Sequence, residues 1–454
     1  MDDYSLTKDF KITWQHKQDP KAHPQNQFSA LVNLATSSYM RNNSYNTDYL
    51  QNTLSSNISF QRGWKNKPYN LSINLRHNQN TLNQQIDLTI PELTFTVNRI
   101  YPFKNKIKNT WYKKFVKNLG FNYNLNSKNT LNAVDSLLFN NISKNMRNGV
   151  KHTLPISTSF NLFKYINISP SFQYNERWYF QKKIKNWNDE LEMLETDTLN
   201  GFWAIRDFRF STQLSTKIFG FITTKNKKFR HILTPTITYS YQPDFSNEKF
   251  GIYTTLETNN GTEKYSFFEN GIYGIPSSIK QSLLNVNLNN NLEMKINNGE
   301  GEEKKIKLIE NLSISGTYNN AIDSLKMSNI SISMRTKLSD KINLKFNSSI
   351  DPYELTDTGT KINKYLLESG KVGRITNLNF DISINLTNPK VEKKSDLVDP
   401  EQLEYINQNL DNFVDFDVPW SLKFYYNFTY NKPTLDSEII QSVNFNGDIN
   451  ITKK

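Results

Sequence analysis

Apolar and polar residues alternate with a period of two along most of the chain. In residues 206–218, 284–296 and 420–430, apolar side chains occupy most of the alternate positions, and polar residues, many of them Asn, occupy most of the positions between. Successive residues of a β-strand face opposite sides, so each such run is a strand with one apolar and one polar face. The pattern predicts an all-β protein.

About seventeen segments of this kind follow one another along the chain. They lie near residues 9–16, 28–36, 53–61, 69–78, 85–97, 118–126, 156–163, 166–176, 206–219, 230–242, 282–296, 305–318, 329–338, 341–350, 376–387, 420–431 and 439–451. Many have ten or more residues, whereas a strand of a soluble protein has about five or six. About ten residues is the length that a tilted strand needs to cross a bilayer.

The connections between these segments alternate in length. Residues 163–166 and 339–340 leave almost no room for a loop, whereas residues 181–205, 243–281, 351–375 and 388–419 are long polar excursions. Short turns at one end and long loops at the other are typical of outer-membrane barrels. A β-sandwich would use moderate loops at both ends. We therefore predict a large antiparallel transmembrane β-barrel, with residues 1–454 forming a single barrel domain of which about seventeen strands are visible.

The composition supports this prediction. Hydrophobic residues make up 36% of the chain, below the roughly 45–50% of soluble domains, yet aromatic residues reach 13%. A barrel explains both values, because only one strand face meets lipid and aromatic girdles lie at both membrane interfaces. Trp178, Tyr179, Trp203 and Trp420 lie at or near strand ends and are the candidate interfacial aromatics. No run approaches the ~18 apolar residues of a membrane helix.

The net charge of +12 does not indicate a nucleic-acid partner. Lys and Arg are scattered in short clusters, whereas nucleic-acid binders concentrate them on one face or tail. Codon bias and solvated loops account for this excess. The first eight residues have no positive segment followed by an apolar one, so either the protein is not exported or the chain lacks its true start.

Motifs for catalysis, metals or cofactors are absent from the sequence. There is no Cys, and the five His residues stand alone without metal-ligand spacing. Gly299-Glu-Gly301 has no helix after it, and no Gly-x-Ser-x-Gly occurs. We predict that the protein is not an enzyme and has no catalytic residue, cofactor or metal.

Four prolines lie at or inside alternating segments: Pro155, Pro170, Pro235 and Pro276. Each removes a hydrogen bond from a strand ladder. One interpretation is a strand end or bulge. The other is a weakened seam between strands, useful to a barrel that opens sideways.

Several short stretches resemble a known family. They are Leu75-Arg-His-Asn-Gln-Asn80, Leu88-Thr-Ile-Pro-Glu-Leu93, Asn98-Arg-Ile-Tyr-Pro-Phe103, Leu154-Pro-Ile-Ser-Thr-Ser-Phe160, Ile168-Ser-Pro-Ser-Phe172, Arg230-His-Ile-Leu-Thr-Pro235 and Asp415-Phe-Asp-Val-Pro-Trp-Ser-Leu422. Together they resemble the barrel region of the LPS-assembly outer-membrane protein LptD, in the form found in Bacteroidetes. The resemblance covers nearly the whole chain, and the Arg230 and Asp415 stretches are its most specific parts.

The resemblance implies a function and partners. Members of this family are very large barrels, preceded by a periplasmic jellyroll domain, that insert lipopolysaccharide into the outer leaflet of the Gram-negative outer membrane. The lipid leaves through a lateral gate between the first and last strands. A lipoprotein plugs the lumen, and periplasmic bridge proteins deliver the lipid. Lys and Arg on the lumen face are natural partners for its phosphates.

This chain departs from the family pattern in three ways. No jellyroll domain is visible before Phe10, the C-terminus lacks an aromatic-ended closing strand, and seventeen is an odd number whereas single-chain bacterial barrels have even ones. These departures indicate an apparent truncation at both ends. Two alternatives to the translocon stay open: a passive porin or uptake channel, and a secreted β-sandwich or adhesin that binds glycans.

Overall fold

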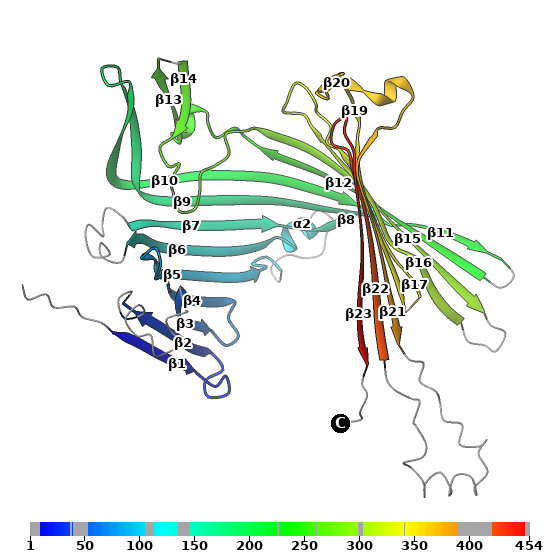
Figure 1. The fold of residues 1–454 in the computed structure, drawn as a ribbon, viewed down its shortest axis with the longest axis horizontal. Coiled ribbons are helices and arrows are strands. Elements are labelled where there is room, and N and C mark those ends of the chain that lie inside the picture. Colours follow the sequence, from blue (N-terminus) through cyan, green and yellow to red (C-terminus); the bar gives the residue numbers. More distant parts are fainter. Residues whose placement is uncertain are drawn as a thin grey trace, which may run out of the picture. The chain divides into compact units, whose positions relative to one another are not determined.

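The structure is a computed structural model, and it describes residues 10–36, 39, 53–104, 113–134, 146–224, 227–259, 261–297, 303–339, 341–387 and 420–449. Within this part, nineteen strands belong to one sheet, and two small hairpins lie outside it (Figure 1). The predicted all-β class is confirmed. The contacts divide the chain into two compact units, and each is described by itself.

Unit 1 comprises residues 1–162, 167–212 and 240–282. Its elements are β1 (Lys11–Lys17), β2 (Asn26–Ala35), β3 (Thr53–Gly63), β4 (Tyr69–Asn80), β5 (Gln85–Ile100), α2 (Lys113–Lys117), β6 (Gly120–Val134), β7 (Met146–Ser157), β8 (Phe160–Leu162), most of β9 (Ile166–Asn188) and β10 (Met193–Ser215), the 3-10 helix η3 (Glu248–Phe250), β13 (Tyr253–Thr258) and β14 (Gly261–Ser266). The hairpin of β13 and β14 belongs to the excursion between β12 and β15.

Unit 2 comprises residues 163–166, 213–239 and 283–454. Its elements are β11 (Ile218–Thr223), most of β12 (Lys227–Gln242) and β15 (Gln281–Asn297), β16 (Glu303–Asn319), β17 (Ile330–Ser339), β18 (Ile342–Asp351), β19 (Tyr353–Leu355), β20 (Lys361–Tyr365), the 3-10 helix η4 (Leu366–Ser369), β21 (Arg374–Thr387), β22 (Trp420–Asn431) and β23 (Glu438–Ile449). The hairpin of β19 and β20 belongs to the excursion between β18 and β21.

The sheet strands are antiparallel, and strands that follow each other in the chain pair with each other. The register places like residues opposite each other. Between β21 and β22, Phe380 faces Phe428 and Ile382 faces Tyr426, whereas Asp381, on the other side of β21, faces Asn427. Across this strand pair, one face of the sheet is thus apolar and the other polar, because the side-chain period of two is in phase between the two strands.

Most of the predicted strands agree with the structure, but several regions differ. The excursions at 243–281 and 351–375 were predicted as loops, yet they contain the hairpins β13–β14 and β19–β20. Residues 146–155 were not predicted as a strand and belong to β7. Residues 181–205 were predicted as a loop. They form the outer halves of β9 and β10, two strands of 23 residues each, with a turn at 189–192 between them. The prediction failed here because Lys, Glu and Asp interrupt the apolar alternation, while backbone pairing between the two strands continues.

The prediction that all long excursions lie at one end of the strands was wrong for residues 388–419. The turn from β17 to β18 is short, and β18 then runs to the excursion at 352–373. β21 returns antiparallel from there, so its last residue, Thr387, lies at the end of the short turn. Residues 388–419 start from that end; they themselves lie outside the described part of the chain.

Candidate functional site

The polar face of unit 2 carries two groups of charged side chains. Glu293 on β15 accepts hydrogen bonds from Arg230 on β12 and pairs with Lys305 on β16, with 3.0 Å between Lys305 Nζ and Glu293 Oε1. On β16, Glu310 pairs with Arg335 of β17 at 3.6 Å. Each of these carboxylates therefore forms an ion pair with a cation on a neighbouring strand. The same face also carries amide and hydroxyl side chains.

Further along the same face, Asp381 of β21 accepts two hydrogen bonds from β22. Tyr425 Oη lies 2.8 Å and Asn427 Nδ2 lies 2.6 Å from Asp381 Oδ1. Asn285 and Ser313 extend the polar face through hydrogen bonds to Thr317 and Asn287. Amides, hydroxyls and paired charges are the groups that solvate a saccharide or a phosphate.

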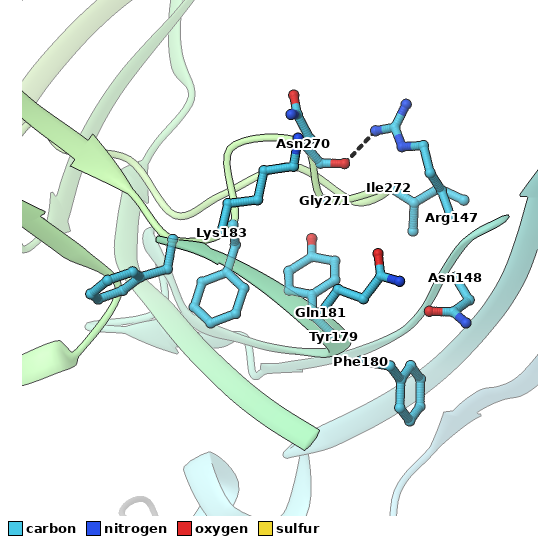
Figure 2. A pocket seen from close by; sticks show the side chains of 11 residues that line it. Arg147, Asn148, Tyr179, Phe180, Gln181, Lys183, Asn270, Gly271 and Ile272 are labelled. Carbon is cyan, nitrogen blue, oxygen red and sulfur yellow. Dashed lines mark hydrogen bonds between the residues drawn. The ribbon is translucent and has the colours of Figure 1, made fainter. Parts of the chain in front are cut away.

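The polar face of unit 1 is covered in part by the excursion between β12 and β15, residues 243–280, which we call the folded loop (Figure 2). Three side chains of the sheet hold its backbone. Arg177 Nε donates to Tyr273 O at 3.2 Å, Tyr179 Oη donates to Gly274 O at 2.6 Å, and Arg147 donates to Asn270 O. Donors on β7 and β9 therefore bind three carbonyls within one short segment, residues 270–274.

A buried ion pair lies beneath this segment. Arg177 on β9 pairs with Asp207 on β10, and Asn175 Nδ2 donates to the same carboxylate at 2.7 Å. The side chains of Arg177 and Asp207 are 9% and 14% exposed. The pair neutralises both charges, and Arg177 Nε donates to the folded loop.

The folded loop has an apolar core of its own. Phe245, Ile252, Tyr253 and Phe268 are buried against Tyr179 and Ile205 of the sheet. Phe268 stacks on Tyr179 with ring centroids 5.5 Å apart. Gly271 lies so close to Tyr179 that a Cβ there would come within 2.5 Å of the ring. The folded loop is therefore seated by close packing as well as by hydrogen bonds.

The phenol of Tyr273 gives the folded loop a predicted pH dependence. Burial raises the pKa of Tyr273, and none of the described residues accepts a hydrogen bond from its hydroxyl. The folded state therefore holds this proton more tightly than the unfolded state. Its stabilisation is complete below the ordinary tyrosine pKa of about 10 and is lost as the pH rises above it.

Raising the pH from 8 to 11 is thus expected to increase the rate of protease cleavage within residues 243–280, and Tyr273→Phe is expected to reduce that increase. It will not abolish it, because burial also raises the pKa of Tyr253, whose hydroxyl donates to Pro276 O. Tyr101→Phe, at an exposed tyrosine, is the control and should leave the pH profile unchanged. A profile of Tyr273→Phe equal to the wild-type profile would contradict the prediction.

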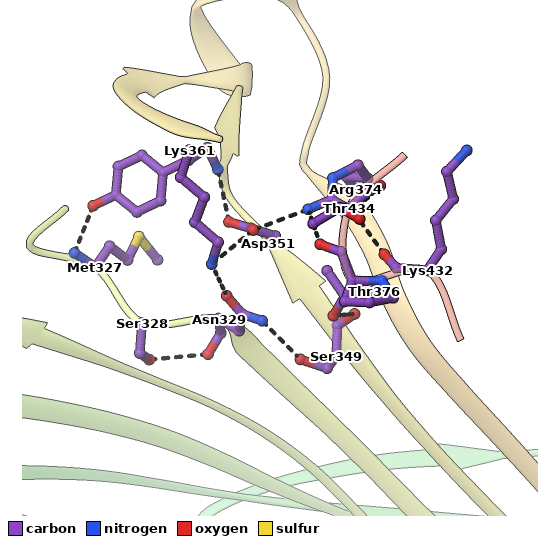
Figure 3. Close-up of polar contacts among 12 residues, drawn as sticks. Met327, Ser328, Asn329, Ser349, Asp351, Lys361, Arg374, Thr376, Lys432 and Thr434 are labelled. Atoms are coloured by element: carbon purple, nitrogen blue, oxygen red, sulfur yellow. Dashed lines mark hydrogen bonds and ion pairs between the residues drawn. The ribbon is translucent and has the colours of Figure 1, made fainter. Parts of the chain in front are cut away.

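A second cluster lies at the excursion end of unit 2 (Figure 3). Asp351, the last residue of β18, has no exposed surface. It pairs with Lys361 Nζ at 2.8 Å and with Arg374 Nη2 at 3.2 Å. We call Asp351, Lys361 and Arg374 the Asp351 cluster.

The Asp351 cluster connects three loops. Arg374 donates to the carbonyls of Lys432, Pro433 and Thr434 in the turn from β22 to β23. Lys361 also donates to Asn329, which lies between β16 and β17. The buried carboxylate of Asp351 thus orients Arg374, and Arg374 binds the turn from β22 to β23, which is distant in the sequence.

The four predicted prolines lie in different settings. Pro155 is in β7 opposite Gln173 of β9. Pro170 is in β9 and accepts a hydrogen bond from Thr158 N, and Pro235 is in β12 and accepts one from Thr216 N. Pro276 lies in the folded loop before β15. Pro155 and Pro170 thus lie on the paired strands β7 and β9, whereas Pro235 and Pro276 lie elsewhere, and a weakened seam stays a prediction.

The predicted interfacial aromatics lie on two different faces. Trp178 is on the apolar face, and Trp420 begins β22 with 38% of its surface exposed. Tyr179 is buried beneath the folded loop, and Trp203 packs against the same core. Contact with the membrane interface stays a prediction for all four residues. Tyr179 and Trp203 also have a packing partner that the sequence did not indicate.

Sequence reasoning missed Arg177, Asp207, Asp351 and Arg374. A charged residue on the polar face of a strand looks the same in sequence whether it is solvated or covered by a loop. Arg177 and Asp207 are 30 residues apart in the sequence, and Asp351 and Arg374 are 23 residues apart. A period-two pattern describes only neighbouring residues and cannot indicate such pairs.

The described residues contain no group of three His, Asp or Glu side chains placed to hold a metal ion. Among the described helices, none has the length and apolarity to cross a membrane.

The fold and its two faces define a large antiparallel sheet protein with membrane-length strands, a polar face and an apolar face. A family model described as LptD protein matches residues 1–353. The chain therefore belongs to the LptD family, which is a family of outer-membrane β-barrels, and the outer membrane is its location.

Two solved structures are similar to the chain at low identity. The siderophore receptor PirA from Acinetobacter baumannii is 7% identical, with a TM-score of 0.31, over 86% of this chain and 54% of the receptor. The ferric preacinetobactin receptor BauA from the same organism is 8% identical, with a TM-score of 0.25, over 87% of this chain and 60% of the receptor. The chain thus spans little more than half of each receptor. No curated protein matches the sequence.

Proposed function

We propose that this chain is the barrel component of the translocon that inserts lipopolysaccharide into the outer leaflet. The observation that carries the proposal is the family match over residues 1–353. The polar faces support it, because their amides, hydroxyls and charge pairs suit a phosphorylated saccharide. The protein is not an enzyme in this proposal: it moves a glycolipid, and the energy comes from partner proteins.

We place the lateral exit for the lipid between the first and last strands of the barrel, as the family resemblance implies. Among the strands that the structure describes, β1 pairs with β2 and β23 pairs with β22. Along β23 nearly every residue is exposed, so its outer edge is available to another strand or to lipid. A lipoprotein in the lumen and periplasmic bridge proteins complete the proposed set of partners.

Depletion of the protein in its native cell tests this function. We expect lipopolysaccharide at the cell surface to fall severalfold within a few generations, while uptake of small solutes is unchanged. Surface lipopolysaccharide is measured by labelling of intact cells, and uptake with a fluorescent solute. The opposite pattern, with lost uptake and normal surface lipopolysaccharide, would favour the porin. A protein recovered in the soluble fraction would favour the secreted sandwich or adhesin.

A further inference from the structure

A row of aromatic rings crosses the apolar face of unit 1. Each of six neighbouring strands contributes one ring, and successive ring centroids are 4.2 to 6.5 Å apart. The rings belong to Tyr69, Phe95, Tyr123, His152, Trp178 and Phe202. Rings with polar atoms in such a row are typical of the level where hydrocarbon meets headgroups.

The length of β9 supports this assignment of depth at Trp178. From Ile168 to Trp178 the strand makes ten residue steps, or about 33 Å at ~3.3 Å per residue. A tilt of about 45° reduces this to roughly 23 Å, close to the ~25 Å apolar band of a barrel. Beyond this row, residues 181–200 of the hairpin are strongly polar. From this length we expect Trp178 to lie where the hairpin leaves the membrane.

An ion pair lies on this apolar face beside the row. Glu176 Oε2 accepts from Arg206 Nε at 3.0 Å and from Tyr174 Oη at 2.5 Å, and Glu176 Oε1 accepts from Trp178 Nε1 at 2.7 Å. Neighbouring residues hold Glu176 on both oxygens. Glu176 in turn orients the guanidinium of Arg206.

Arg206 presents the rest of its guanidinium outward. Its side chain is 63% exposed, whereas that of Glu176 is 18% exposed. In the part of the chain that the structure describes, the side-chain partners of Arg206 are Glu176 and the Tyr174 hydroxyl, both on β9. A charge pair on a lipid-facing wall is costly, so such residues mark functional positions. A guanidinium fixed through Nε offers a fork of parallel N–H groups that matches the geometry of a phosphate.

Exposed rings lie beside this fork. Phe202 lies on the same face of β10 as Arg206, four residues before it in the chain, and is 59% exposed. Phe180 on β9 is 39% exposed. Their ring centroids are 6.0 Å apart. A phosphorylated sugar can use both features, because its phosphate suits the fork and the C–H faces of its ring pack on aromatic rings.

We propose that Arg206, oriented by Glu176 and flanked by Phe202 and Phe180, binds a phosphate of a lipopolysaccharide molecule on the outer wall of the barrel, at the headgroup level of the outer leaflet. The choice of this lipid rests on the proposed function, and the long hairpin at this end of β9 and β10 supports the outer side. Binding on the wall is separate from passage along the polar face.

The test measures lipid binding by the purified full chain in detergent micelles, by native mass spectrometry. The probes are lipopolysaccharide, the same lipid after enzymatic removal of its phosphates, and phosphatidylglycerol. Arg206→Gln is expected to weaken lipopolysaccharide binding about tenfold, because two charge-assisted hydrogen bonds are lost. Arg209→Gln is the matched control: it lies on the same strand but on the opposite face, where Arg209 binds Gln242, and should bind as wild type does. Slower migration on heating in gel electrophoresis verifies the fold of each variant.

Three results support or overturn the site. Loss of binding on dephosphorylation, together with the Arg206→Gln effect, supports it. Equal binding by wild type and Arg206→Gln overturns it, and so does phosphatidylglycerol binding as tightly with the same dependence on Arg206. If Arg206→Gln does not fold, Phe202→Leu replaces it, since it removes the ring but keeps an apolar side chain; unchanged lipopolysaccharide binding by that variant overturns the site. No transport is measured, so the proposed function stands or falls by the depletion experiment alone.

Discussion

Replacing Asp351 with Asn is expected to free the loops at the excursion end of unit 2 while the strands stay paired. The substitution leaves Arg374 and Lys361 beside a neutral amide in a site without solvent exposure at residue 351. Breaking a buried ion pair from one side costs about 3–5 kcal/mol. We expect about 3 kcal/mol here, because the side chain of Lys361 is 39% exposed and can return to water.

Hydrogen exchange measures this effect directly. Amides in residues 352–373 and 432–437 should exchange about a hundredfold faster in Asp351→Asn, while those in β21 and β22 keep their protection. The turn at 432–437 is the informative part, because Arg374 binds three of its carbonyls and the turn lies far from residue 351 in sequence. Faster exchange in residues 352–373 alone would contradict the coupling between the two loops.

Glu354→Gln is the matched control for this experiment. Glu354 also pairs with a lysine, Lys364, at 3.0 Å, but on an exposed hairpin. The Ser369 hydroxyl and Lys364 lower the pKa of Glu354, so its contribution is present above the ordinary pKa of glutamate and is lost as the pH falls below it. At pH 7 exposed pairs contribute little, and we expect Glu354→Gln to exchange as wild type does.

Replacing Phe245 with Ala is expected to unseat the folded loop from unit 1. Phe245 is 1% exposed and packs against Phe208 and Phe250, with ring centroids 5.7 and 5.0 Å away. Removing a buried Phe side chain costs about 3–5 kcal/mol. The hydrogen bonds from Arg147, Arg177 and Tyr179 are then insufficient to keep the loop closed, because a typical one contributes only about 1 kcal/mol.

Limited proteolysis reports on the folded loop. We expect cleavage within residues 243–280 to accelerate at least tenfold, while the two fragments stay associated as a folded protein in detergent. Phe163→Ala, at a turn residue that is 77% exposed, is the control and should cleave as wild type does. Protection equal to the wild type would contradict the prediction, because it would show that the remaining packing and hydrogen bonds keep the loop closed without Phe245. Complete unfolding would show that the loop and the sheet are one cooperative unit.

The fold could be predicted from the sequence to a large extent. In residues 377–387 and 420–431 apolar residues alternate with polar ones at every position except Tyr425, and the structure pairs these segments in the register that the alternation requires. The outer half of the β9–β10 hairpin could not be predicted in this way. Its residues are polar on both sides, and only the pairing of two backbones makes it a strand.

The candidate sites could be predicted far less. Trp178 was singled out because aromatic residues at strand ends are common in barrels, but its contact with Glu176 and thus with Arg206 depends on the alignment of two neighbouring strands. Pro276 was interpreted as a strand residue, and the structure places it in the folded loop, where its carbonyl accepts the Tyr253 hydroxyl.

The sequence alone determined the strand character and the polar and apolar faces, because a period of two is a local property of the chain and does not depend on neighbouring strands. It also determined the family, through short stretches that resemble known members. Only the tertiary structure decided which charged residues are solvated and which are covered. Asp207 and Asp381 both occupy polar-face positions; the first is buried beneath the folded loop with Arg177, and the second binds Tyr425 on an open face. The physical reason is that burial depends on which distant segment returns to cover a strand, and the packing of that segment is not encoded in the strand's own pattern.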